Sequence, residues 1–339
     1  MQSKPQTDHK IELNSAEVAN LWTSYMSNTG AICLFENFLS TVEDREIRSI
    51  LELAMLLSKE QVPKLTSFFK EEKLPVPDGF SVEKDVNKET PRLFTDDFYI
   101  FFIQNFCEQK MDAYSYALST SARFDMSEYF TECLHEISTL YNKTSTVLLS
   151  KGIFIRSPYI PAPKKVEYVE KQNYLAGWFG HRRPINVIEI TGIYYNMIRN
   201  QLGRTLCMGY SQVAKSKKVR DYFIRGRDIA DKHVEEFASV LSSEFLPSAS
   251  TWDTLPTSST EATFSDKIMM YNITILNGIG VGNYGRNLGT SPRRDLGLLY
   301  TKLMSEIALF AEDGANIMID NAWLEQPPQT PDRDQLAHE

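Results

Sequence analysis

One pair of residues in this chain, Glu132-x-x-His135, has the spacing of a metal site built on helices. Di-iron four-helix bundles use a Glu on each of two helices and a Glu-x-x-His pair on each of the other two. Here the pair lies mainly off the apolar stripe of its helix, and Lys302 and Ser305 stand at the equivalent places later in the chain. We therefore expect Glu132 and His135 to form a solvated surface pair.

His233 is the more interesting candidate, because helical periodicity places it on the inner, apolar side of a predicted helix. A buried polar side chain needs hydrogen-bond partners, and Glu306 on another predicted helix could approach His233 at the same level. Two interpretations stay open. His233 is a hydrogen-bonded core histidine, or it forms half of a metal or small-ligand site with Glu306, with Tyr194 and Tyr284 as neighbours. A bound metal ion is the one cofactor that this pattern suggests.

The sequence offers no set of residues for nucleophilic catalysis or nucleotide binding. Two of the five histidines, His9 and His338, lie in the tails, and no Ser/His/Asp or Cys/His arrangement can be assembled from the others. The run Gly278-x-Gly280-x-Gly282 has the letters of a nucleotide loop but follows no predicted strand. We expect close helix packing there, no catalytic residues and no enzyme activity, with a di-iron oxidoreductase as the least favoured alternative.

The elements that must position these residues occur twice along the chain. The run Tyr114 to Ile137 recurs as Tyr284 to Ile307, and the earlier parts of the two halves also correspond, so that His233 matches Gln61. Other matched pairs include Asn14/Asn186, Glu17/Glu189, Asn28/Asn200, Leu74/Leu246, Pro75/Pro247, Arg123/Arg293, Asp125/Asp295 and Glu136/Glu306. A duplication of this length predicts two tandem domains with the same fold.

Each half carries the signals of four helices. Asn14 with Glu17, and Asn186 with Glu189, fit a capping box at the start of the first helix. The connection between the second and third helices is long in both halves, and an extended segment of that length can cross a whole bundle. One long crossover between two helical hairpins is the connectivity of ferritin-like bundles. We predict an all-α fold of two tandem ferritin-like four-helix bundles, with a long crossover between helices 2 and 3 of each.

The helix signals divide the chain into five segments. These are a flexible N-terminus (1–13), the first four-helix bundle (14–152), a connector rich in proline and aromatic residues (153–184), the second bundle (185–322) and a C-terminal tail (323–339). The connector contains Tyr168, Tyr174, Trp178 and Phe179, which is too aromatic for a freely solvated linker. We expect it to pack on one or both bundles.

The composition limits the partners and the cellular compartment that we expect for this chain. The formal net charge is -8 and no basic stripe is interleaved with aromatic residues, which argues against a nucleic-acid partner. No run of about 18 apolar residues occurs, so we expect no membrane span. The four cysteines lie inside apolar helical patterns and form no C-x-x-C pair, which indicates buried thiols in a reducing cytoplasm. The sequence does not predict an oligomeric state.

Four motifs resemble one known family. They are Leu149 to Ile153 running into Arg156 to Pro161, the turn Ala176-Gly177-Trp178-Phe179-Gly180, and the close Trp323-Leu324-Glu325-Gln326-Pro327-Pro328. Together with the duplication, they resemble domain-of-unknown-function family 3231 of spore-forming bacilli. That family is related to the coat F class of spore coat proteins and is expected to be ferritin-like.

The resemblance implies a structural or interaction role linked to the spore or its coat, with spore-coat or other proteins as partners. It brings no established activity, so it assigns no catalytic residue. Members of the family often carry a His at the helix-two position in both halves, and Gln61 departs from that pattern. The alternative function is a metal- or small-ligand-binding bundle centred on His233.

Overall fold

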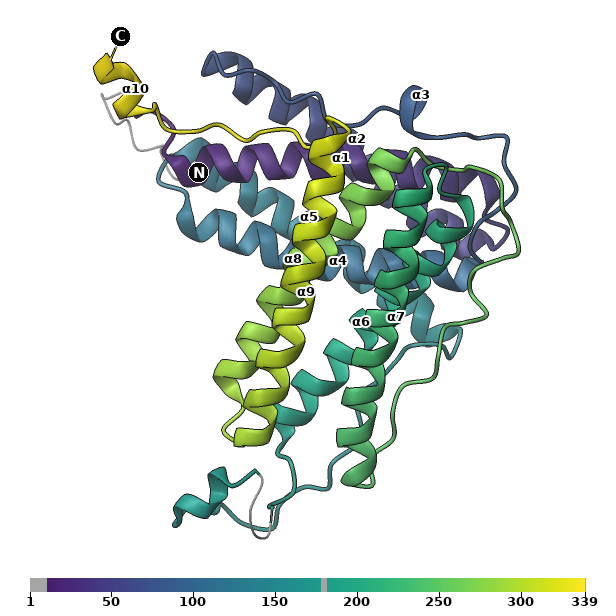
Figure 1. Cartoon of the computed structure of the whole chain (residues 1–339), viewed down its shortest axis with the longest axis vertical. Coiled ribbons are helices and arrows are strands. Elements are labelled where there is room, and N and C mark those ends of the chain that lie inside the picture. The colour runs from purple at the N-terminus through teal and green to yellow at the C-terminus, as the bar shows by residue number, and fades with distance from the viewer. Residues whose placement is uncertain (1–10, 178–181, 339) are drawn as a thin grey trace, which may run out of the picture.

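The computed structural model describes residues 11–177 and 182–338, and within them it contains helices and no strand (Figure 1). The first half forms α1 (Ser15–Thr41), α2 (Arg45–Glu71), the single turn α3 (Val82–Asp85), α4 (Asp96–Thr120) and α5 (Phe124–Ser150). The second half forms α6 (Val187–Val213), α7 (Lys217–Ser243), α8 (Asp266–Thr290) and α9 (Arg294–Asp320). The short helices η1 (Gln172–Leu175) and α10 (Arg333–His338) lie in the connector and the tail. The predicted all-α fold of two tandem halves is confirmed.

Two carboxylates fix the order of the helices in the first bundle. Glu17, at the start of α1, completes the capping box and also accepts hydrogen bonds from the backbone N–H groups of Ala122 and Arg123, both at 2.8 Å. Asp96, at the start of α4, accepts from the backbone N–H of Asp44 at 2.7 Å. Because each carboxylate joins the start of its own helix to the end of the other, α1 and α4 are antiparallel.

The second bundle repeats this arrangement. Glu189 accepts from the backbone N–H of Arg293 at 3.2 Å, and Asp266 accepts from those of Lys215 and Ser216 at 3.0 and 2.9 Å. In each bundle the second and third long helices are therefore parallel, and the chain between them must return along the whole bundle. This is the physical reason for the two long crossovers that the sequence predicted.

The two crossovers pair with each other. Val86 lies opposite Phe264, and Phe94 lies opposite Pro256, as isolated antiparallel bridges. Four backbone hydrogen bonds join the segments, from the N–H groups of Thr95, Ser265, Asn87 and Thr257 to the carbonyl groups of Leu255, Asp85, Thr263 and Leu93, respectively. Each contact has a counterpart made by the equivalent residues of the other half.

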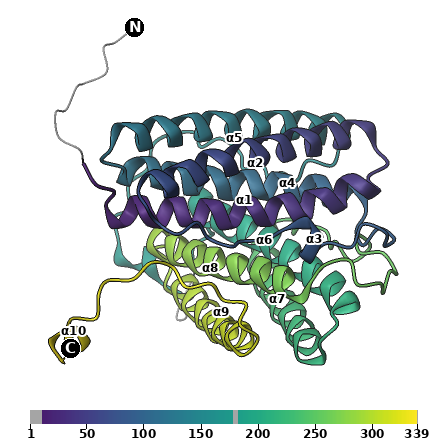
Figure 2. The same cartoon turned by 90° about the horizontal axis from the view of Figure 1, so that it is seen from above.

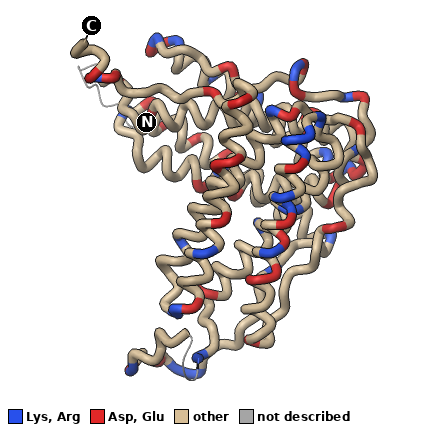
Figure 3. Tube along the Cα trace, viewed as in Figure 1, with Lys and Arg blue, Asp and Glu red and all other residues tan. Residues whose placement is uncertain are grey.

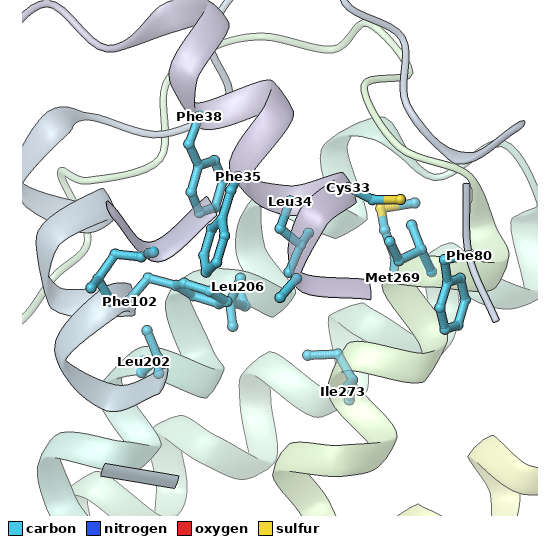
Figure 4. Packing of buried hydrophobic residues seen from close by; sticks show 14 of the residues in the cluster. Cys33, Leu34, Phe35, Phe38, Phe80, Phe102, Leu202, Leu206, Met269 and Ile273 are labelled. Atoms are coloured by element: carbon cyan, nitrogen blue, oxygen red, sulfur yellow. The ribbon is translucent and has the colours of Figure 1, made fainter. Parts of the chain in front are cut away.

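The helices of the second bundle run across those of the first (Figures 1 and 2), and the two bundles share a core. The larger cluster of buried apolar side chains contains Phe35 and Phe102 of the first half together with Leu206, Met269 and Ile273 of the second (Figure 4). A smaller cluster fills the far end of the second bundle. This burial stabilises the chain without disulfides, since all four cysteines are free and buried.

The connector differs from the expectation that it packs on the bundles. Residues 159–173 are all exposed, although the flanking Ile155 packs against both core clusters. Tyr174 is half-buried and stacks on the guanidinium of Arg183, 3.9 Å from the ring centre. Charged residues alternate with the apolar ones between these two anchors and keep the segment in water. Trp178 and Phe179 lie outside the described residues.

Candidate functional site

His233 of α7 is fully buried at the centre of the second bundle. Its Nδ1 lies 3.0 Å from the hydroxyl oxygen of Tyr284, and its Nε2 lies 3.1 Å from Oε2 of Glu306. The Tyr284 hydroxyl also accepts a hydrogen bond from Asn200 Nδ2 at 2.7 Å. The structure thus brings together three of the four residues that the sequence suggested. Tyr194 instead packs edge-on against its neighbour in α6.

The protonation of this group follows from its surroundings. Burial lowers the pKa of His233, although the hydrogen bond to the Glu306 carboxylate opposes the change. A neutral imidazole accepts a hydrogen bond from the Tyr284 hydroxyl at Nδ1 and donates one from its Nε2–H to Glu306. Burial raises the pKa of Glu306, but hydrogen bonds from Lys232 at 2.7 Å and from His233 outweigh it, so the pKa lies below its ordinary value. The carboxylate is therefore ionised and shared between these two donors.

The first bundle contains a similar network at the equivalent positions, in which the asparagine bonds to Gln61 instead of to the tyrosine. The Tyr114 hydroxyl donates to Oε1 of Gln61 at 2.6 Å, and Asn28 Nδ2 donates to the same oxygen at 3.1 Å. Gln61 Nε2 donates to Oε2 of Glu136 at 3.4 Å. An amide and a neutral imidazole both present one acceptor and one donor, so Gln61 and His233 link a tyrosine to a glutamate in the same order.

This equivalence bears on the metal site suggested for His233 and Glu306. Both ring nitrogens of His233 already have partners, and Lys232 occupies the second oxygen of Glu306. Among residues 11–177 and 182–338 no group of three or more His, Cys, Asp or Glu side chains gathers in a way that could hold a metal ion. A cation here would have only two protein ligands and a nearby ammonium group, so the residues present fit it poorly. Metal binding at His233 stays a prediction.

The structure places the other sequence motifs away from this network. Glu132 and His135 are both exposed, and Glu132 forms an ion pair with Lys64 at 3.6 Å. The prediction that they form a surface pair is confirmed.

The expectation of close helix packing at the glycine run is wrong. A Cβ atom built on Gly278 or Gly282 would meet nothing within 4 Å, and one on Gly280 would meet only Ile307, at 3.4 Å. Gly278 and Gly282 leave open space beside α8, whereas Gly280 lies at ordinary contact distance from Ile307 of α9.

Lys110 of α4 is a candidate that the sequence reasoning missed. It is 5% exposed, and its Nζ donates to Asn28 Oδ1 at 3.1 Å. The ammonium also lies 5.2 Å from the ring centre of Tyr114 and 5.5 Å from that of Phe106. Burial lowers the pKa of Lys110 to about 7. The available signal was a lysine inside an apolar helical stripe at a place where the second half has Gly280.

Comparison with known proteins places this chain in a family. A search of curated proteins finds no match. A crystal structure of a candidate spore coat protein from Bacillus halodurans C-125 aligns with a TM-score of 0.42 and 18% identity, over 45% of this chain and 98% of that one. A likeness at this level says nothing about the function of this chain.

In the described part of the chain, no helix is long and apolar enough to cross a membrane.

The profile of the family described as protein of unknown function, DUF3231, matches residues 2–166 and again residues 173–336. Each match covers one half of the duplication, and together they cover nearly the whole chain. The chain therefore belongs to the DUF3231 family and carries its domain twice.

Proposed function

We propose that this chain is a non-catalytic interaction protein whose contact surface is the exposed connector, and that it acts at the spore or its coat. The observation that carries the interaction role is the exposure of large apolar side chains in residues 159–173. Tyr159, Val166 and Tyr168 are 84%, 81% and 86% exposed. Clustered apolar side chains in water mark contact sites more often than single exposed ones do. The link to the spore is what the family resemblance implies.

The anchoring of the connector also supports this role. Ile155 packs against both core clusters at one end. At the other end Arg183 forms an ion pair with Glu189 at 2.7 Å, and Glu189 is itself fully buried. A loop fixed at both ends loses less conformational entropy when a partner covers it than a free tail would. Along the described part of the chain, acidic and basic residues are intermixed over both bundles (Figure 3).

The test is recovery of the protein from purified spores. The variant Tyr159→Ser, Val166→Ser, Tyr168→Ser is compared with Phe245→Ser, which removes an apolar side chain that is 98% exposed elsewhere. We expect the wild type and Phe245→Ser to fractionate with the coat proteins and the triple variant to be lost from that fraction. Wild-type protein absent from spores, or a triple variant retained as well as the wild type, would refute the proposal.

A second candidate function is metal or small-ligand binding at His233. A cavity of about 80 Å³ lies beside the network and is lined by Asn200, Tyr284 and Gly280 among others. Elemental analysis of untagged wild-type protein and of His233→Ala tests it. Metal present in the wild type and absent from the variant would support binding, whereas no metal in either sample would rule out a metal site.

A further inference from the structure

A large pocket in the described part of the chain lies between the two bundles, away from the His233 network. It has a volume of about 780 Å³, within the range of small-molecule sites. Its walls come from α1 and α4 of the first bundle and from α8, α9 and the segment after α9 of the second. The lining is mainly apolar and includes Trp22, Phe106, Ile275, Ile279, Met318 and Leu324.

Among the described residues that line this pocket, Lys110 is the one cation, and no acid neutralises it. No Lys110 ion pair exists within residues 11–177 and 182–338, and the contacts of its Nζ are the neutral Asn28 amide and two aromatic rings. The lining carboxylate of Glu325 is used elsewhere, because its oxygens accept hydrogen bonds from the backbone N–H groups of Asp78 and Gly79 at 3.0 and 3.2 Å. A buried ammonium without a counter-ion is costly, so an anion entering the pocket would relieve that cost.

The equivalent place in the other half of the molecule is closed. There Glu108 stands where the second half has Gly278, and Arg199 stands where the first half has Ser27. The side chains of Glu108 and Arg199 form an ion pair at 3.3 Å, and the space left is about 30 Å³. The two halves have thus diverged at matched positions, and the open side is the one that carries Lys110.

We propose that the pocket between the bundles binds an apolar monocarboxylate, such as a medium-chain fatty acid, with its carboxylate against Nζ of Lys110 and its hydrocarbon chain along Phe106 and Met318. The single cation matches a single negative charge. A phosphate monoester would bring a charge of about -1.5 to -2 and leave part of it unpaired. The Nζ of Lys110 has two further N–H donors besides the one used by Asn28, and the two carboxylate oxygens can accept them. This site is independent of the connector and of the interaction role.

The glycine at position 278 allows a sharp test of the site. Leucine at Gly278 would project into the pocket, whereas leucine at Gly282 would sit on the same helix, in equally open space, outside the pocket lining. Lys110→Met keeps an unbranched side chain, shorter by one atom, and removes its charge. Isothermal titration calorimetry at pH 7 with decanoate, and with decanol as the uncharged counterpart, measures binding to the full-length protein and each variant.

We expect decanoate to bind the wild type and Gly282→Leu equally. Lys110→Met should weaken decanoate binding about tenfold or more, the value of a charged hydrogen bond, and leave decanol binding unchanged. Gly278→Leu should weaken the binding of both compounds.

Three results would overturn the proposal: wild-type protein that does not bind decanoate, decanol that binds as tightly as decanoate, or Gly278→Leu that binds like Gly282→Leu. Thermal unfolding confirms that each variant is folded. Should Lys110→Met fail to fold, the decanol comparison and the glycine pair still decide the outcome.

Discussion

Replacing Lys110 with methionine should change how the stability of this protein depends on pH. The ammonium is buried beside Asn28, and burial lowers its pKa from 10.5 to about 7. Below pH 7 the lysine is protonated in both the folded and the unfolded protein, so the folded state carries the full cost of a buried charge. Between pH 7 and 10.5 the unfolded chain binds a proton that the folded protein does not bind. The stability of the wild type must therefore rise with pH over that interval.

The size of the effect follows from the pKa difference. The limiting slope is about 1.4 kcal/mol per pH unit. Because titration is only half complete at pH 7, the free energy of unfolding of the wild type should gain about 2 kcal/mol over that of Lys110→Met between pH 7 and pH 9. Below pH 6 the difference between the two proteins should be nearly constant.

Urea unfolding at pH 5, 6, 7, 8 and 9 measures this difference. Comparison with Lys110→Met cancels the contribution of every other titrating group that the substitution leaves unchanged. Cys133, which acts on Lys110 electrostatically, has a pKa that burial raises to about 12 and stays protonated in the folded protein throughout. A difference that stays flat from pH 5 to pH 9 would show that Lys110 titrates normally, and the argument from burial would be wrong.

Three other substitutions test the networks and the helix ends, each by urea unfolding. His233→Gln copies the arrangement around Gln61, so we expect the free energy of unfolding to change by less than about 1 kcal/mol at pH 7. Because burial lowers the pKa of His233, the variant should also lose less stability than the wild type as the pH falls below 6.5. A loss of several kcal/mol at pH 7 would contradict the equivalence of the two networks. Glu17→Ala leaves three backbone N–H groups without their acceptor and should lower the free energy of unfolding by on the order of 3 kcal/mol. An unchanged urea midpoint would show that this carboxylate does not stabilise the fold. Gly282→Ala meets no atom within 4 Å and should stabilise α8 by about 0.5–1 kcal/mol, so a lower midpoint would mean that the site is not open.

Local signals in the sequence were sufficient to predict the four long helices of each half and their order, but not the short helices α3, η1 and α10. The capping boxes at Asn14 and Asn186 are both present, because Asn and Glu three residues apart act within one turn. The second role of Glu17 and Glu189, which fix the turn of the other hairpin, could not be foreseen. It depends on residues about a hundred positions away that meet only in the folded bundle.

The candidate sites also combine features that the local sequence predicts with features that arise only in the folded molecule. Periodicity placed Gln61 and His233 inside their bundles, and the level of Glu306 on its predicted helix indicated it as a partner of His233. Tyr284 and Tyr194 were both suggested as neighbours, and only Tyr284 bonds to His233. The pocket at Lys110 depends on how the second bundle crosses the first, and helical periodicity contains no information about that crossing. The glycine run was misinterpreted for the same reason, because only the placement of the bundles shows that nothing packs against Gly278.

The reciprocal pairing of the two crossovers has a consequence for the origin of the chain. Val86 meets Phe264 as Phe94 meets Pro256, which is the pattern of an isologous interface with approximate two-fold symmetry. One half of the molecule therefore carries both sides of the contact. We expect a protein consisting of a single such domain to form a symmetric homodimer through this segment. On that view the present chain is such a dimer joined into one polypeptide. Once joined, the two copies can carry different residues at matched positions. One side has the Glu108–Arg199 ion pair where the other side has the pocket lined by Lys110.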